Sequence, residues 1–318
     1  MYRRVALLVL LTTSVPQAKA ESPDEQALRL LNHYRQLAGL TPVKLDRKLS
    51  AGCMEHANYM VQNQGTDAMV GLNPHTQRPN LPGASAAGAA CAKAADLFPG
   101  VSDLGVAIDA WMAGMYHRRP MLDPQLERIG VGYARLPDGM LMAALRFENA
   151  TLRRGGWPVA YPADDQTDVP LEYGTEFPNP IPNHGTGGYA ITLQFPPFDK
   201  VTGVSAKLTE AAGKPIESFL SNPEHPATSF GQFGVVCLIP KQSLQPQHAY
   251  SVQIDATWKG KPGRWTWSFS TVSLRTIEAS DDRALAGAIN IASLVHGTVA
   301  DGGMRNSETT HRRFHSRG

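Results

Sequence analysis

Apolar residues recur at helical spacing in three segments of the first half of the chain. Ser22-Pro23-Asp24-Glu25 starts the first segment with a serine cap, a proline at the first helical position and a glutamate three residues after the cap. Asp46 caps the second segment, and the third begins at Ser102. The pattern predicts three amphipathic helices. Their apolar faces are formed by Ala27, Leu30, Leu31, Tyr34 and Leu37, by Leu49, Cys53, His56, Ala57 and Met60, and by Leu104, Ala107, Ile108, Trp111 and Met115.

Two strand-like runs follow the third helical segment. Residues 129–136 and 140–147 flank Pro137-Asp138-Gly139, and Asp-Gly between such runs is a strong hairpin signal. Three amphipathic helices need a surface to cover, and this hairpin supplies one. The first part of the chain is therefore predicted to place helices on an antiparallel sheet, in the α+β class.

The second half of the chain alternates apolar and polar residues with a period of two. A linker is expected at 152–158, and half-buried strands are expected at 189–195, 204–208, 235–239, 250–256 and 265–269. Strands at this spacing, separated by glycine-containing turns, predict a β-sandwich. Cys237 alternates inward with Val235 and Ile239, so we expect it to be a buried free thiol.

The two ends of the chain differ from the rest. Residues 1–20 combine Arg3 and Arg4, a short apolar run and Ala18-Lys19-Ala20, which is typical of a secretory signal sequence. The apolar run is about half the ~20 residues that a membrane anchor needs. We therefore expect export, to the periplasm or the extracellular space, with no transmembrane anchor after cleavage. Near the other end, residues 280–297 have a helical pattern, and 301–318 form a polar, basic tail.

Composition narrows the functional classes. The 318 residues include 30 Lys and Arg against 28 Asp and Glu, a net charge of +2, and 42% are apolar, which fits a globular chain and neither a nucleic-acid-binding surface nor a disordered one. Cleavage after Ala20 removes Arg3, Arg4 and Lys19 and changes the net charge to −1. We expect a signal sequence at 1–20, domains at 21–152 and 153–272, and a helix and tail at 273–318.

Several motifs of the first domain together resemble the CAP superfamily, also called SCP or PR-1-like, and most closely its bacterial secreted branch. They are Leu30-Leu31-Asn32-His33-Tyr34-Arg35, the segment from Ala110 to Arg118, Leu122-Asp123-Pro124 and Ile129-Gly130-Val131-Gly132-Tyr133. The resemblance covers about residues 24–150. It implies an α-β-α sandwich with a central cleft, lined in many members by two histidines and two glutamates.

The second domain resembles Ig-like and fibronectin-III-like modules over about residues 158–272. Leu244-x-Pro246 followed by Tyr250-x-Val252 is similar to their tyrosine corner, and the run from Trp267 to Thr271 is similar to their final strand. The resemblance implies an all-β Ig-like sandwich, acting as a spacer or an adaptor to the cell envelope.

The CAP resemblance places the cleft histidines at His75 and His117, with Tyr116 and Arg118 beside the second. The positions of the two glutamates fall in the Ala-rich segment 83–90 and at Gly114, neither of which has a carboxylate. Two imidazoles can bind a small ligand, act as general acid and base, or hold Zn²⁺ weakly, since stable zinc sites have three or four ligands. Alternatively, His117 is purely structural. His56, at the edge of an apolar helix face, is expected to pack rather than to bind.

The family places the Ala-rich segment near the second helix, so the resemblance implies a disulfide between Cys53 and Cys91; two buried thiols are the alternative. Without carboxylates, the leading interpretation is a non-enzymatic protein whose cleft binds a small ligand, a metal or a cell-envelope component. One alternative is a hydrolase or peptidase using His75 and His117. Another is envelope glycan adhesion through Trp258, Trp265 and Trp267 of the second domain, although core packing also explains these residues.

Overall fold

The computed structural model describes residues 21–150, 155–174, 176–210 and 213–273. The predicted signal sequence, and the helix and tail predicted from residue 280 onward, lie outside these ranges. Within the described ranges, no helix is both long and apolar enough to cross a membrane.

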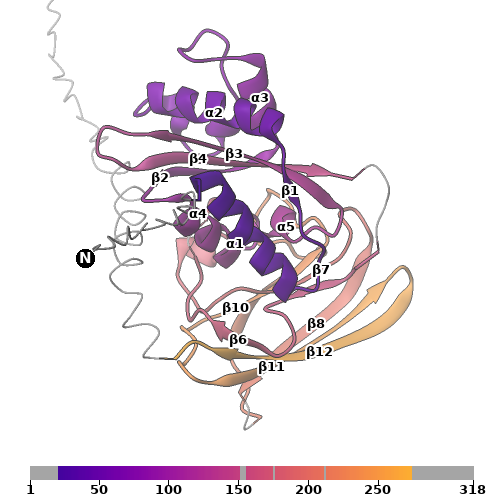
Figure 1. Cartoon of the computed structure of the whole chain (residues 1–318). Helices are drawn as coiled ribbons and strands as arrows, with labels where there is room; N and C mark the ends of the chain where they lie inside the picture. The colour runs from indigo at the N-terminus through magenta and orange to yellow at the C-terminus, as the bar shows by residue number, and fades with distance from the viewer. Residues whose placement is uncertain (1–20, 151–154, 175, 211–212, 274–318) are drawn as a thin grey trace, which may run out of the picture.

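The first part of the chain is a sheet covered by helices on both faces (Figure 1). The sheet has the strand order β1-β3-β4-β2, and β3 and β4 form the predicted antiparallel hairpin. Helices α2 and α3 lie over one face, and α1, α4 and α5 lie over the other (Figure 1). The strands are β1 (Lys44–Leu45), β2 (Ala95–Val101), β3 (Leu126–Arg135) and β4 (Leu141–Asn149); the helices are α1 (Pro23–Leu37), α2 (Arg47–Gln62), α3 (Ala86–Ala92), α4 (Leu104–Ala113) and α5 (Arg118–Met121).

The first two helices begin where their caps predict. Glu25 accepts hydrogen bonds from the backbone N–H and the hydroxyl of Ser22 at the start of α1. Asp46 accepts from the backbone amides of Lys48 and Leu49 at the start of α2. These bonds satisfy polar groups that a helix terminus leaves without partners, so local sequence determines where both helices start.

The third helix is shorter than its apolar pattern predicts. It begins at Leu104, with Asp103 accepting from Val106 N, and it ends at Ala113. The predicted start at Ser102 and the predicted inclusion of Met115 are therefore wrong. The backbone amides of Met115 and Tyr116 donate instead to the carboxylate of Glu176, far along the chain, and so do not extend the helix.

Four further elements of this part were not predicted: β1 and α5, which are only two and four residues long, and α3 and β2. The Ala-rich sequence of α3 has no apolar periodicity, and β2 contains Pro99 at a register shift in its pairing with β4. A disulfide joins Cys53 on α2 to Cys91 on α3, with 5.2 Å between their Cα atoms. It fixes the helical layer on that face of the sheet.

The second part of the chain, described over residues 155–174, 176–210 and 213–273, is called the β-rich part below. It contains two four-stranded sheets, with strand orders β5-β7-β10-β9 and β6-β12-β11-β8. All five predicted strands are present; β5, β6 and β9, of three or four residues each, are too short to show a clear alternation. The strands are β5 (Val159–Tyr161), β6 (Gln166–Val169), β7 (Ile191–Gln194), β8 (Val201–Glu210), β9 (Ser218–Ser221), β10 (Val235–Pro240), β11 (Ala249–Trp258) and β12 (Lys261–Thr271), with short 3-10 helices η1 (Asp67–Met69), η2 (Asn73–His75) and η3 (Pro182–His184) elsewhere.

Two local predictions for this part are confirmed. Cys237 is a free, buried cysteine. The Tyr250 hydroxyl accepts a hydrogen bond from Gln245 N at 2.8 Å, the contact that defines a tyrosine corner. The Ig-like assignment of the whole domain stays a prediction.

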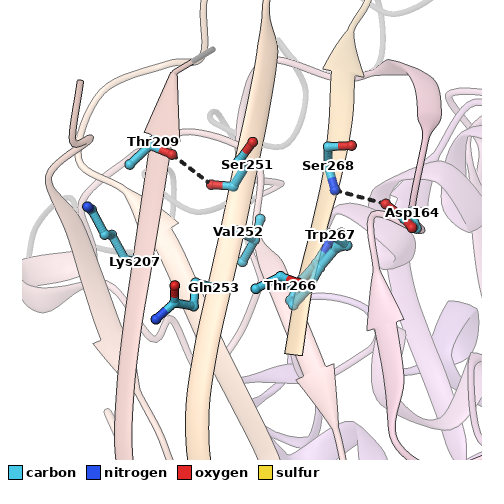
Figure 2. Close-up of a pocket in the computed structure, with 9 residues that line it drawn as sticks. All are labelled: Asp164, Lys207, Thr209, Ser251, Val252, Gln253, Thr266, Trp267 and Ser268. Carbon is cyan, nitrogen blue, oxygen red and sulfur yellow. Dashed lines mark hydrogen bonds between the residues drawn. The ribbon is translucent and has the colours of Figure 1, made fainter. Parts of the chain in front are cut away.

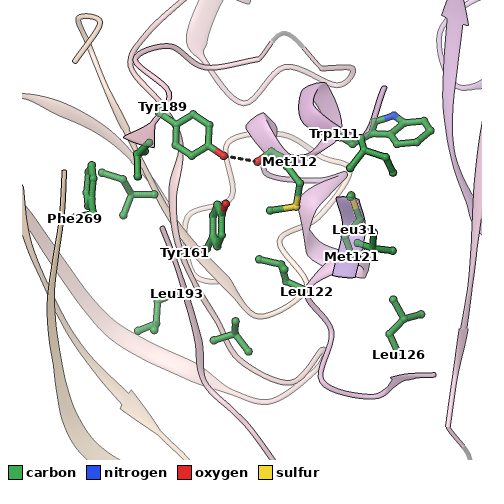
Figure 3. Close-up of a cluster of buried hydrophobic side chains, with 14 of the residues drawn as sticks. Leu31, Trp111, Met112, Met121, Leu122, Leu126, Tyr161, Tyr189, Leu193 and Phe269 are labelled. Atoms are coloured by element: carbon green, nitrogen blue, oxygen red, sulfur yellow. Dashed lines mark hydrogen bonds between the residues drawn. The ribbon is translucent and has the colours of Figure 1, made fainter. Parts of the chain in front are cut away.

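The two parts of the chain share one hydrophobic core. Tyr161 and Tyr189 of the β-rich part lie beside α4, and the Tyr189 hydroxyl donates to the Met112 carbonyl at 3.1 Å (Figure 3). The helical layer α1, α4 and α5 thus lies between the first sheet and the β-rich part (Figure 1). Buried members from both sides include Leu31, Ile108, Met121, Leu122, Leu126, Leu193, Phe195 and Phe269.

Candidate functional site

His75 lies at the end of η2 and has one ring nitrogen held by the backbone. Its Nδ1 is 3.1 Å from the Ala92 carbonyl oxygen, and because a carbonyl only accepts, Nδ1 carries the proton. Burial lowers the pKa of His75; the Ala92 hydrogen bond opposes this, and the nearby charge of His117 adds to the lowering. We therefore expect a neutral ring at neutral pH.

His117, directly before α5, pairs with a carboxylate from the second part of the chain. Its Nδ1 is 2.9 Å from Glu176 Oε2, and the two side chains are 17% and 2% exposed. Burial alone lowers the pKa of His117, but the hydrogen bond to Glu176 and the negative charges of Asp96 and Glu176 outweigh burial, so this pKa is raised. Among the described residues, neither His75 nor His117 makes a hydrogen bond through Nε2.

Glu176 is one of the two candidate site residues, with Asp96, that sequence reasoning missed. Its carboxylate accepts hydrogen bonds from three successive backbone amides, from the His117 ring and from the Tyr173 hydroxyl. It lies 59 residues after His117, in a segment between strands with no periodic pattern. One signal for such a residue is present in the sequence: Gly114, close to His117, stands where the CAP resemblance expects a glutamate.

Gly114 leaves the space in which this carboxylate lies. A Cβ atom at this position would be 2.6 Å from Glu176 Oε2, closer than atoms that are not bonded can approach. The CAP resemblance puts a family glutamate at this same position. The expectation of a site without carboxylates is therefore wrong, because Glu176 brings one from the β-rich part.

A second carboxylate, Asp96 of β2, is buried near the same histidine. Burial raises its pKa to about 7, although the charges of His117 and Arg119 favour the ionised form. Among the described residues its Oδ2 has no hydrogen-bond partner. His75, His117, Asp96 and Glu176 thus form one electrostatically coupled group.

Tyr116 and Arg118, the other two residues predicted to line the cleft, are engaged with the β-rich part. The Tyr116 hydroxyl is 2.7 Å from the Thr228 hydroxyl. Arg118 is 1% exposed, and its guanidinium donates to the carbonyls of Met112 and Ala190. The rings of Tyr161 and Tyr189 also contact this guanidinium, at 4.8 and 4.9 Å.

The site does not fit a stable zinc centre. In the part of the chain that the structure describes, no group of three or more His, Cys, Asp or Glu side chains could hold a metal ion. Zinc in stable sites has three or four protein ligands, whereas His75 and His117 would offer only their two Nε2 atoms. Weak binding of Zn²⁺ by His75 and His117 stays a prediction.

Exposed apolar side chains lie close to this group. Val70 and Leu72 are 58% and 39% exposed and flank Gly71, three to five residues before His75. Phe177, which follows Glu176, is 54% exposed, and its ring is 3.5 Å from the Cβ position at Gly71. We call Val70, Leu72 and Phe177 the apolar rim.

A separate groove of about 370 Å³ lies on the outer face of the β8-β11-β12 sheet (Figure 2). Its lining is mainly polar, with Lys207, Gln253 and Thr266 in one row across the strands. Trp267 is buried, and Trp258 and Trp265 pack against Phe195, so the three tryptophans form no open platform. Glycan adhesion through this domain stays a prediction.

Comparison with known proteins agrees with the CAP resemblance that the motifs of the first part show. Residues 28–145 match the family model described as the Cysteine-rich secretory protein family, CAP. Residues 28–145 are a CAP domain. His75, His117 and Asp96 belong to the CAP domain, whereas Glu176 lies outside it. No curated protein matches the sequence significantly.

Solved structures resemble the chain only distantly. CopC from Methylosinus trichosporium OB3b has 12% identity and a TM-score of 0.25, covering 36% of this chain and 90% of CopC. An outer surface protein from Borrelia burgdorferi has 14% identity and a TM-score of 0.30, covering 40% and 93%. An extracellular protein containing a SCP domain from Bacillus anthracis str. Ames has 18% identity and a TM-score of 0.27, covering 41% and 45%. These scores are too low to transfer any property.

Proposed function

We propose that this is an exported, non-enzymatic CAP-domain protein that binds a small amphipathic ligand beside His75 and His117. The β-rich part forms a wall of the site rather than a spacer. The observation that carries the proposal is the His117–Glu176 pair, because it joins both parts of the chain at a histidine next to exposed apolar side chains.

The chemistry of the site suggests the class of ligand. The pKa of His117 is raised, so this ring is suited to donate from Nε2 to an anionic or hydrogen-bond-accepting group. The apolar rim offers Leu72 and Phe177 to the apolar portion of the same molecule. Pockets for small molecules commonly combine an apolar lining with a few polar groups that fix orientation.

The site offers no evident nucleophile for covalent catalysis. Among the described residues, no hydroxyl or thiol hydrogen-bonds to His75 or His117, which is the usual arrangement for an activated nucleophile. Burial raises the pKa of Cys237 to about 12, so its thiol stays protonated and unreactive. A binding role requires none of these groups.

Binding of anilinonaphthalenesulfonate, a fluorescent amphipathic anion, tests the proposal. We expect saturable binding to the full mature chain, weakened about tenfold or more by His75→Ala and by Phe177→Ser. Phe198→Ser is the matched control, because Phe198 is an exposed phenylalanine, at 92%, in the loop before β8 and is not part of the apolar rim. Equal binding by all three variants would contradict the proposed site.

A hydrolase is the second candidate, and one observation favours it. The pKa of His75 is lowered and that of His117 is raised, and such a displacement of neighbouring pKa values can separate a general base from a general acid. Hydrolysis of casein or p-nitrophenyl acetate that is lost in both His75→Ala and His117→Ala would support this candidate. Activity that survives in either variant would argue against it.

A further inference from the structure

We propose that the CAP domain contains a carboxylate-binding site and that the β-rich part fills it with Glu176, which thereby positions His117. The inference deepens the proposed function, on which its use of His117 rests. It assigns the site a chemical class of occupant: a carboxylate that is held by backbone amides and is supplied by this chain itself.

The donors that surround Glu176 form a complete set for a carboxylate. Oε1 accepts from Met115 N at 2.6 Å and from the Tyr173 hydroxyl at 2.8 Å. Oε2 accepts from Tyr116 N and His117 Nδ1, each at 2.9 Å, and from His117 N at 3.3 Å. An ionised carboxylate has about four lone-pair positions and no donor, so the four donors within 2.9 Å fill these positions, and the set of five would oppose a neutral amide.

The site belongs to the CAP domain, since four of the five donor groups lie on residues 115–117. Only Tyr173 comes from the same segment as Glu176. At 2% exposure, the carboxylate has exchanged water for these donors, and burial of a charge is tolerated only with such compensation. If the carboxylate is removed, three backbone amides lose a buried acceptor, which is costly.

Gly114 shows that the space is reserved for this carboxylate. Its φ of −87° and ψ of 163° are extended values that any residue adopts, so the backbone does not require glycine. The requirement comes from Glu176 Oε2, which would be 2.6 Å from a Cβ atom. The charged and titratable groups that face His117 here are Glu176, Asp96 and His75, with Arg119 facing Asp96.

The test is to empty the site and refill it with a small carboxylate in the full mature chain. Glu176→Ala is expected to lose the downfield Nδ1–H proton resonance of His117 in NMR spectra, because the acceptor has gone. Propionate should bind this variant in the millimolar range, at least about tenfold more tightly than it binds the wild type, and should restore the resonance. Glu172→Ala is the matched control, since Glu172 is a glutamate of the same segment that lies outside the donor set.

A second variant returns the carboxylate covalently. Gly114→Asp, combined with Glu176→Ala, places a carboxylate one bond beyond the Cβ position that lies nearest to Oε2. We expect this double variant to regain the His117 resonance without propionate. If Glu176→Ala alone does not fold, recovery of the fold by propionate or by Gly114→Asp is the same test.

Three results would overturn the inference. They are an unchanged His117 resonance in Glu176→Ala, propionate binding no tighter in this variant than in Glu172→Ala, and a Glu176→Ala protein that neither propionate nor Gly114→Asp restores. Anilinonaphthalenesulfonate binding separates this inference from the proposed function. A rescued site with no binding of the dye would contradict the ligand proposal alone, and binding of the dye with no rescue would contradict the carboxylate site alone.

Discussion

The two faces of the CAP sheet are built in different ways. On the α2 and α3 face, the chain packs backbone against backbone: a Cβ atom at Gly132 of β3 would be 2.1 Å from the carbonyl carbon of Cys53, which is itself disulfide-bonded to Cys91. On the α1, α4 and α5 face, buried polar groups such as Arg118 connect the helices to the β-rich part. The first face is fixed by neighbours within the CAP domain, whereas the second depends on another part of the chain.

This difference shows which face of the sheet can hold a site that uses residues from outside the CAP domain. The α2 face has little tolerance for change, because glycines and a disulfide set the distance between layers. The opposite face meets a second unit through directed hydrogen bonds, and His117 obtains its carboxylate there. The His117–Glu176 pair is therefore found on the face that is specified over long range.

The largest expected effect concerns the disulfide of the α2 face. Replacing Cys53 and Cys91 together by alanine should lower the free energy of unfolding by about 4 kcal/mol, because the bridge closes a 38-residue separation. Urea denaturation of the full chain measures the change. Cys237→Ala, which keeps the bridge, is the control; a double variant as stable as this control would show that the face is held by packing alone.

A pH dependence of about 3 kcal/mol should arise from His56 on the same face. Burial lowers its pKa from 6.5 to about 4, so the unfolded chain binds a proton before the folded one does. Stability should therefore fall as the pH drops from 6.5 to about 4. His117, with its raised pKa, acts in the opposite sense, because its contribution is present below pH 6.5 and is lost as the pH rises through its folded pKa.

Denaturation curves of His56→Gln across this pH range measure the effect, and a flatter slope than that of the wild type is expected. His33→Gln, on an exposed position of α1, should keep the wild-type slope. Identical slopes for the two variants would rule out His56 as the source.

Close backbone packing on the α2 face predicts a loss of about 2 to 3 kcal/mol for Gly132→Ala. The added methyl group must push α2 away from β3, and overpacking of this kind has few ways to relax against backbone atoms. Thermal denaturation compares this variant with Gly155→Ala, where a Cβ atom would meet nothing within 4 Å. A Gly132→Ala protein as stable as Gly155→Ala would mean that the two layers can separate freely.

The opposite face should respond to Arg118→Lys with a loss of about 2 kcal/mol. A lysine cannot reproduce the planar guanidinium that reaches the carbonyls of Met112 and Ala190 at once, so a buried acceptor loses its partner. Arg78→Lys, at an exposed ion pair with Asp67, should change stability by less than about 0.5 kcal/mol. Equal effects in urea denaturation would remove Arg118 from the set of interactions that join the two parts.

Much of the fold was predictable where the determinants are local. The caps Ser22 and Asp46 located two helices, Asp138-Gly139 located the hairpin, and period-two alternation located five strands of the β-rich part. The end of α4 was mispredicted because the amides of Met115 and Tyr116 bond to Glu176, 61 and 60 residues away. Short strands such as β5 and β9 depend on their neighbours and leave no pattern of their own.

The residues of the candidate site also differ in whether a motif or long-range packing determines them. His75 and His117 were identified through a family resemblance that lies within the CAP domain. Glu176 follows no motif, and its pairing with His117 arises only when the β-rich part packs against α4. Asp96 was missed because its role comes from burial in β2, a strand that the sequence did not predict.

The shared core between α4 and the tyrosines of the β-rich part bears on how this chain could be divided or recombined. The sequence suggests a cut between residues 152 and 153, as between two interchangeable modules. Such a cut would expose the apolar side of α4, strip Arg118 of the rings of Tyr161 and Tyr189, and take away the acceptor of three backbone amides. The β-rich part therefore cannot be exchanged for another domain as an independent module. A change in its linker alters the histidine site as directly as a change in the CAP domain.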